Sequence, residues 1–328
     1  MKFLIAGFGS IGRRHLNNIR SLGYSDIALY RTHHSTIADE SIKDIPVETD
    51  INKALAGKPD AVIISNPTAK HLDVAIPAAE SGCHLFLEKP IFNNYDGIDD
   101  LKKAIKIGGG KVFVGYQFRF HPGIQKIKEI LDKGFFGKPL SARCEWGEYL
   151  PGWHPWEDYR KSYSARKDLG GGVVLTLSHP IDYLRWLFGD VKYLWAMTGN
   201  LSDLELEVED FAEIGMNFNN GCVASLHLDY YRRPSVHSLN IVFEEGVLKW
   251  NNESGDVIIE RVDGTIEEYY KIPGDFERNQ LFINEMKHFI DVIEDKCESI
   301  CTLEDGEKAL ILSMAILKSG LHGQRIFI

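Results

Sequence analysis

The first residues whose type and spacing indicate a ligand-binding site are three glycines near the N-terminus. The segment Met1–Gly12, MKFLIAGFGSIG, is an apolar run of strand character ending in Gly7, Gly9 and Gly12. In this spacing Gly7 permits a tight turn, Gly9 lets the backbone approach a pyrophosphate, and Gly12 lets the next helix pack on the strand. Amides at a helix N-terminus attract phosphate. The pattern predicts a dinucleotide site, although such turns also close ordinary strand–helix junctions.

The end of the next apolar run bears on the choice between NAD and NADP. NAD sites place an acidic residue about 20 positions after the glycine turn to hold the ribose hydroxyls. Here the run IALY is followed by Arg31, Thr32, His33 and His34. A cationic and hydroxyl set suits the extra phosphate of NADP. NADP is therefore the favoured cofactor and NAD remains possible, because Arg31 could also be a solvated loop residue.

A lysine follows the fourth apolar run, which ends in Glu88, Lys89 and Pro90. At the carboxyl edge of a parallel sheet, beside a nicotinamide site, a lysine can exchange a proton with a reacting oxygen, and burial lowers its pKa toward that task. The alternative is a surface Glu–Lys pair before a proline turn. We treat Lys89 as the first catalytic candidate.

Strands and helices must alternate to position these residues. From residue 1 to about 119 the runs KFLIAG, IALY, DAVIIS, HLFLEK and KVFVGY alternate with helical segments, including 10–22 and 70–81. This order is typical of a doubly wound parallel sheet, a Rossmann domain. Ligands bind at the carboxyl ends of such strands. The expected cofactor contacts are Gly7, Phe8, Gly9, Ser10, Ile11, Gly12, Arg31, Ser65, Asn66, Pro67, His71, Glu88 and Lys89.

The pattern changes after FRFHP at 118–122. A helix is expected over 123–133, strands follow one another between about 190 and 272, and helices close the chain at about 278–294 and 303–319. Successive strands without helices between them indicate an antiparallel sheet. We therefore predict an α/β protein with a nucleotide-binding Rossmann domain at 1–119. The remainder, 120–328, is predicted as an α+β substrate-binding and oligomerisation domain with a large, mainly antiparallel sheet.

Composition limits the class of protein. The 328 residues carry a formal charge of −10, which argues against nucleic acid as a partner. No apolar run approaches the roughly 18–20 residues of a membrane span, so we expect a cytoplasmic protein without a membrane partner. The five cysteines are scattered, and the one close pair, Cys297 and Cys301, has no Cys or His neighbours in a metal-like cluster. We expect neither a disulfide framework nor a metal.

Four ordered motifs carry a family resemblance. The turn Gly7–Gly12, the triplet Glu88–Lys89–Pro90, FRFHP at 118–122 and the GGG…HPID stretch at 170–182 resemble the Gfo/Idh/MocA family of oxidoreductases. The resemblance implies a two-domain NAD(P)-dependent enzyme acting on sugars, polyols or their derivatives. It implies that Lys89 lies at the active site. It also implies a homodimer or homotetramer paired through the large sheet.

The same resemblance singles out a histidine and an absent aspartate. Family members present an aspartate and, about one helical turn later, a histidine that serves as acid or base; His179 matches the histidine. Leu175 and Thr176 stand four and three residues before it, so the aspartate is missing. Thr176, Asp182 or Tyr163 could take part of the proton traffic. His179 could equally be a capping or core residue, and Asp182 a buried ion-pair partner.

The segment 153–172, WHPWEDYRKSYSARKDLGGG, mixes aromatic and basic residues before His179. Aromatic faces suit sugar rings, and arginine suits carboxylate or phosphate groups. We expect this segment to wall the substrate site and the substrate to be an anionic sugar, such as a uronic acid or a nucleotide sugar. The aromatic residues could instead seal a domain junction or a subunit interface.

The function that combines these observations is reversible hydride transfer between a nicotinamide cofactor and a secondary alcohol or ketone. In this interpretation Lys89 polarises the reacting oxygen and His179 relays its proton. The missing aspartate motivates the alternative, a catalytically weak cofactor-binding sensor or scaffold of the same fold.

Overall fold

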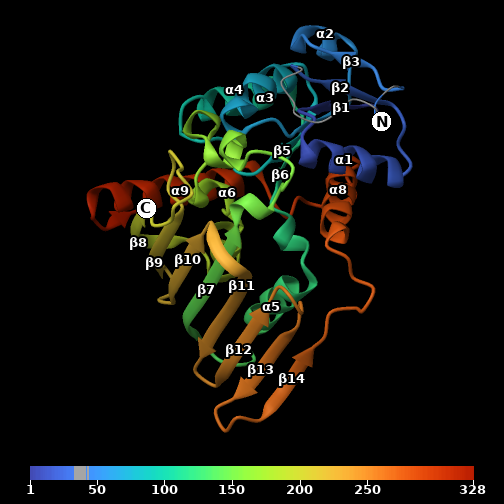
Figure 1. The fold of residues 1–328 in the computed structure, drawn as a ribbon. Coiled ribbons are helices and arrows are strands. Elements are labelled where there is room, and N and C mark those ends of the chain that lie inside the picture. Colours follow the sequence, from blue (N-terminus) through green and yellow to red (C-terminus); the bar gives the residue numbers. More distant parts are fainter. Residues whose placement is uncertain (33–41, 43) are drawn as a thin grey trace. The chain divides into compact units, whose positions relative to one another are not determined.

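The computed structural model describes residues 1–32, 42 and 44–328, which form two compact units (Figure 1). The first unit contains Met1–Gln117 and Glu277–Glu307. The second contains Phe118–Phe276 and Lys308–Ile328. The chain thus leaves the first unit just before the FRFHP motif and returns to it near the C-terminus.

The first unit is built on a six-stranded parallel sheet. Its strand order is β3-β2-β1-β4-β5-β6, so the order reverses direction between β1 and β4. In a doubly wound sheet this reversal opens the crevice in which ligands bind. The predicted parallel sheet is confirmed. The strands are β1 (Phe3–Ala6), β2 (Ile27–Tyr30), β3 (Val47–Glu48), β4 (Ala61–Ile64), β5 (His84–Glu88) and β6 (Val112–Gly115).

Two pairs of helices cover this sheet, with α3 beside α4 and α1 beside α8. Figure 1 shows the pairs on opposite faces. The α1 helix buries His15, Leu16 and Ile19, at the three- and four-residue spacing that places side chains on one helical face. The helices are α1 (Ser10–Ser21), α2 (Ile51–Ala56), α3 (His71–Glu80), α4 (Ile98–Gly108) and α8 (Asn279–Ile293).

The second unit is built on a nine-stranded sheet of order β14-β13-β12-β11-β7-β10-β9-β8-β15. Every neighbouring pair is antiparallel except β7 with β10. The predicted large, mainly antiparallel sheet is confirmed. The strands are β7 (Pro139–Tyr149), β8 (Val191–Gly199), β9 (Phe211–Phe218), β10 (Val223–Asp229), β11 (Tyr231–Phe243), β12 (Gly246–Asn251), β13 (Val257–Arg261), β14 (Ile266–Tyr270) and β15 (Ile326–Phe327).

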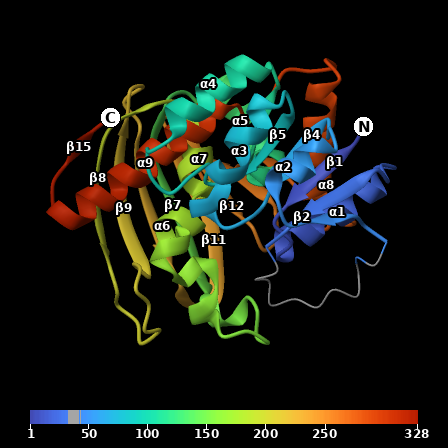
Figure 2. The same ribbon diagram turned by 90° about the horizontal axis from the view of Figure 1, so that it is seen from above.

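Figure 2 shows α6 and α7 on the same side of β8 and β9, and α9 contacts β8 where the Ala196 amide donates to the Ser319 hydroxyl at 2.8 Å. The helices are α5 (Pro122–Lys133), α6 (Val173–Thr176), α7 (His179–Phe188) and α9 (Leu303–His322), the last beginning in the first unit. Burial alternates along β9, as a half-covered sheet requires. In the part of the chain that the structure describes, no helix combines the length and apolar character needed to cross a membrane.

Candidate active site

The glycine turn between β1 and α1 has the geometry of a phosphate cradle. Gly7 has φ +90°, and a Cβ there would lie 2.5 Å from the Asn66 backbone nitrogen; at Gly12 it would lie 2.2 Å from the Gly7 carbonyl oxygen. Both positions therefore require glycine. Among the residues that the structure describes, none beyond the two chain neighbours of Gly9 has an atom within 4 Å of a Cβ placed there. This open space beside the backbone fits the pyrophosphate of a dinucleotide, and Ser10 and Ile11 begin the adjoining helix.

The segment after β4 forms a second side of this cradle. The Ser65 hydroxyl donates to the Ala6 and Gly7 carbonyl oxygens at 3.1 and 3.0 Å, joining the ends of β1 and β4. His71 is buried, with Nε2 2.9 Å from the Asn66 carbonyl oxygen and Nδ1 3.3 Å from that of Ile91. Burial lowers the pKa of His71, so the ring is neutral near pH 7. The His71 ring thus lies between the loop after β4 and the loop after β5, and as a neutral imidazole it donates to one of the two carbonyl oxygens.

Arg31 lies at the end of β2 and is only 6% exposed. Its guanidinium carbon is 5.9 Å from the centre of the Phe8 ring, and its backbone nitrogen donates to the Glu48 carbonyl oxygen at 3.0 Å. The structure therefore brings Arg31 to the glycine turn, where Phe8 lies between Gly7 and Gly9. His33 and His34, expected beside Arg31, lie outside the described residues.

A buried ionisable network lies behind Lys89. His15 Nε2 is 2.7 Å from Glu88 Oε1, and the Lys89 backbone nitrogen donates to Glu88 Oε2 at 3.3 Å. Glu285 of α8 is completely buried, and burial together with the Glu88 charge raises its pKa well above the usual range. Glu88 therefore packs inward behind the cradle, whereas Lys89 is half-buried. The sequence analysis missed His15 and Glu285; the placement of Glu285 between Leu281 and Phe289 on an apolar helical stripe was the available signal.

His179 lies in an aromatic setting in the second unit. It begins α7 and is 3% exposed, with its ring 5.7 Å from that of Trp146 and 5.1 Å from that of Phe118. Trp146 also stacks on His237 at 4.2 Å. These rings fix the plane of the imidazole, as an acid or base needs.

Asp182, one turn beyond His179, forms a bidentate ion pair. Arg119 donates to its carboxylate through Nε at 2.9 Å and Nη2 at 2.6 Å, and both side chains are 1% exposed. In such a pair the Arg119 guanidinium balances the charge of the Asp182 carboxylate. Asp182 is therefore a buried ion-pair partner, which is one of the two alternatives that the sequence analysis left open. This geometry favours a positioning role for Asp182.

The other two candidates for proton transfer, Tyr163 and Thr176, lie around the Tyr230 ring. The Tyr230 hydroxyl donates to the Gly172 carbonyl oxygen at 2.9 Å and also interacts with the Thr176 hydroxyl. Tyr163 is near enough to act electrostatically on Tyr230. A carboxyl group that the sequence analysis missed, Glu209, completes the group: Glu209 Oε1 accepts a 3.1 Å bond from the Val174 amide.

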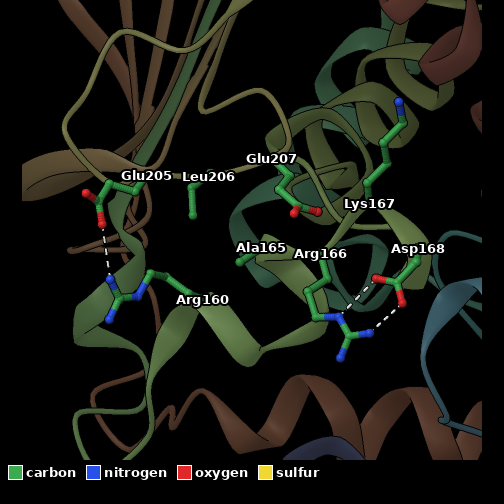
Figure 3. A pocket seen from close by; sticks show the side chains of 8 residues that line it. All are labelled: Arg160, Ala165, Arg166, Lys167, Asp168, Glu205, Leu206 and Glu207. Atoms are coloured by element: carbon green, nitrogen blue, oxygen red, sulfur yellow. Dashed lines mark hydrogen bonds and ion pairs between the residues drawn. The ribbon is translucent and has the colours of Figure 1, made fainter.

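A cavity of about 750 Å³ opens beside this group, within the second unit (Figure 3). Figure 3 shows its ion pairs: Arg160 faces Glu205, and Arg166 forms a two-pronged pair with Asp168. The lining thus contains three basic and three acidic side chains. Such paired charges offer both donors and acceptors to hydroxyl groups. The lining residues are Arg160, Ala165, Arg166, Lys167, Asp168, Glu205, Leu206 and Glu207.

A glycine cradle on a doubly wound sheet, followed by a lysine at a strand end, defines the class of dinucleotide-dependent oxidoreductases. Family models agree with this class. The model "Oxidoreductase family, NAD-binding Rossmann fold" matches residues 1–116, and the Gfo/Idh/MocA C-terminal domain model matches residues 124–249. The chain belongs to the Gfo/Idh/MocA family and is an NAD(P)-dependent oxidoreductase. The resemblance carried by the four motifs is confirmed.

The chain is similar over its full length to characterised relatives. Myo-inositol 2-dehydrogenase of Thermotoga maritima is 25% identical over 343 residues, covering 97% of this chain and 96% of that protein. The fold matches the WlbA dehydrogenase of Bordetella pertussis, solved with NADH and UDP-GlcNAcA, with a TM-score of 0.83, 22% identity and coverage of 100% and 98% of the two chains. It also matches levoglucosan dehydrogenase, solved with NADH and levoglucosan, with a TM-score of 0.87, 18% identity and coverage of 100% and 99%.

Proposed function

We propose that the protein transfers a hydride between a nicotinamide cofactor and a secondary alcohol or ketone of a sugar, a polyol or one of their derivatives. The observation that carries the proposal is the cradle at Gly7–Gly12, with its open side at Gly9. The bound cofactor would supply the hydride chemistry. Lys89 would donate a hydrogen bond to the reacting oxygen, and His179 would exchange its proton.

The substrate class is supported by the relatives and by the cavity of the second unit. The relatives' names include an inositol, levoglucosan and a nucleotide sugar acid, all polyhydroxylated rings. The paired charges in the cavity suit hydroxyl groups, and Lys167 and the arginines could take an anionic substituent. The test is oxidation of a matched panel of neutral sugars, uronic acids and nucleotide sugars. Turnover of an acid in preference to its neutral parent supports the anionic subclass, and the reverse contradicts it.

We propose NADP as the preferred cofactor, because Arg31 lies at the glycine turn. Replacing Arg31 by alanine should weaken NADPH binding by about 10–100-fold, the loss of one charge-assisted hydrogen bond, and should leave NADH binding nearly unchanged. The measurement is a fluorescence titration of nucleotide-free protein with each cofactor.

The exposed Arg20 at the end of α1 provides the matched control, since Arg20→Ala removes the same charge away from the turn. Both solved relatives named above carried NADH. Tighter binding of NADH than NADPH by the wild-type protein would refute the preference assigned to Arg31.

We propose that the protein is a homodimer or homotetramer that covers the open face of the large sheet. On β8, Trp195 and Met197 are 47% and 59% exposed, and the Trp195 ring lies over Gly215 of β9. Exposed apolar side chains gathered on one face commonly mark an interface. Replacing Trp195 and Met197 together by glutamate should give monomers in sedimentation velocity, whereas Leu321→Glu on α9 should not. A monomeric wild-type protein would exclude the proposal.

A further inference from the structure

The segment from Gly170 to Ser178, which leads into His179, contains no carboxylate of its own. The structure supplies one from the loop between β8 and β9. Glu209 is bonded to the segment twice: its backbone carbonyl oxygen accepts from the Val173 amide at 3.1 Å, and its side-chain Oε1 accepts from the Val174 amide at 3.1 Å. Only the bond to Val174 uses the Glu209 side chain, so a substitution of Glu209 can remove this bond and leave the backbone bond to Val173 in place.

The Glu209 carboxyl group lies against Gly172. A Cβ at Gly172 would lie 2.4 and 2.6 Å from its two oxygens, and Gly172 has φ +109°. Glycine at this position therefore allows the carboxyl to approach the backbone. On the other side, the Gly172 carbonyl oxygen accepts the hydrogen bond of Tyr230. The turn at Gly172 is held between Glu209 and Tyr230.

Charged and titratable groups from several elements surround this turn. Asp210, beside Glu209, is 1% exposed and accepts bonds from the Leu201 and Ser202 amides at 2.8 and 2.9 Å. Tyr230 is completely buried, and Tyr163 and Glu148 of β7 act on it electrostatically. Burial, opposed by two backbone hydrogen bonds and aided by the Asp210 charge, raises the pKa of Glu209 to about 7. Burial raises the pKa of Tyr230 well above 10, so its phenol stays neutral.

The carboxyl group also adjoins the cavity of Figure 3 through two segments. Ala165 lines the cavity and ends the short turn that begins at Tyr163. Glu207 lines it too, two residues before Glu209 in the same loop. The turn that Glu209 holds therefore connects the cavity wall to the start of α7, where His179 lies.

We propose that Glu209 is the positioning carboxyl group of the substrate site, which in its neutral form holds the Gly172–Thr176 turn in front of His179. The effect of Glu209 on kcat that this inference predicts rests on the proposed function, whereas its effect on stability does not. In its neutral form Glu209 fits the turn without an uncompensated charge. Ionisation places a second negative charge beside Asp210 in this enclosed site, and that cost outweighs what the carboxylate gains from its bond to the Val174 amide.

The first test needs no substrate. Because the folded pKa of Glu209 lies above its unfolded value, its contribution to stability is full at acidic pH and is lost as the pH rises through about 7. Glu209→Gln keeps the Oε1 acceptor and cannot ionise. The urea midpoint of this variant minus that of wild type should therefore increase between pH 5 and pH 8. A difference that does not change with pH overturns the proposal.

The second test uses the active enzyme. Wild-type kcat should inflect near pH 7, and Glu209→Gln should remove that inflection while keeping most activity at pH 6. Glu209→Ala, which retains only the backbone bond, should lower kcat on the order of 10–100-fold at every pH by misplacing the turn. Asp203→Asn, on the exposed part of the same loop, is the control with wild-type behaviour. An unchanged pH profile in Glu209→Gln refutes the positioning role.

The two tests separate failure of this inference from failure of the proposed function. A pH-dependent unfolding difference with no turnover on any sugar would leave the proton exchange of Glu209 established and would refute the oxidoreductase proposal for those substrates. Turnover with neither pH effect would sustain the proposed function and refute the role of Glu209.

Discussion

Replacing Asp182 by alanine is expected to destabilise the second unit by about 3–5 kcal/mol, because it leaves the Arg119 guanidinium buried without its counter-charge. Both side chains are 1% exposed and share two hydrogen bonds. The arginine also lies 5.5 Å from the Trp186 ring, so it has no simple route to solvent. Urea unfolding should show the loss as a lower midpoint with an unchanged slope.

The sequence allows this unfolding to be followed in the second unit alone. All six tryptophans lie between Trp146 and Trp250, within that unit, so tryptophan fluorescence reports on it. The control is Asp168→Ala, which breaks the bidentate but exposed pair with Arg166 and should leave the urea midpoint nearly unchanged. Replacing Arg119 by methionine and Asp182 by leucine together should recover most of the loss. A cost below about 1 kcal/mol for Asp182→Ala would contradict the assignment of this pair as structural.

The strands and helices could be predicted closely because their signals are local. The expected helix at 123–133 is α5, Pro122–Lys133, and the expected helix at 278–294 is α8, Asn279–Ile293. The glycine turn could also be predicted from the sequence. Nearby backbone atoms leave no room for a side chain at Gly7 or Gly12, so glycine must occur at both positions, and their spacing is visible in the sequence. Such features depend on residues a few positions apart, or on periodicity along one element.

Contacts between distant residues left no comparable signal. The pairing of Arg119 with Asp182 spans 63 residues, and the packing of Glu277–Glu307 with the first unit spans more. Glu209 stands in an acidic loop, where a carboxylate is ordinarily solvated. In the folded protein it is partly buried instead, because its carboxyl group lies against the backbone of Gly172, which only the folded chain brings to it. The sequence therefore indicated Tyr163 and Thr176 as proton-transfer candidates without the carboxyl group beside them.

Replacing Lys89 by methionine is expected to lower kcat by about 10²–10⁴-fold, the usual contribution of a positioned proton donor. Methionine keeps the length of the side chain and removes its donors and charge. The Lys89 backbone bond to Glu88 and the pairing of Glu88 with His15 would remain, because neither uses the lysine side chain. Lys89 is one of many expected cofactor contacts, so cofactor affinity should fall by no more than about tenfold, which 1.4 kcal/mol represents, and far less than kcat. Steady-state kinetics and a cofactor titration on the same preparation measure both quantities.

Lys103→Met on α4 provides the matched control, since that side chain is 72% exposed and its pair with Asp100 lies on the helix surface. It should retain wild-type kcat. Lys89→Arg keeps a positive charge with a far higher pKa, so it should bind substrate and still turn over slowly. Lys89→Met with kcat within about threefold of wild type would remove Lys89 from the chemistry, because that change is far below the effect of losing a general acid. Tight cofactor binding by the wild-type protein without turnover of any sugar would instead favour the sensor or scaffold alternative. In that case the cradle at Gly7–Gly12 binds the cofactor, and Lys89 takes no part in a reaction.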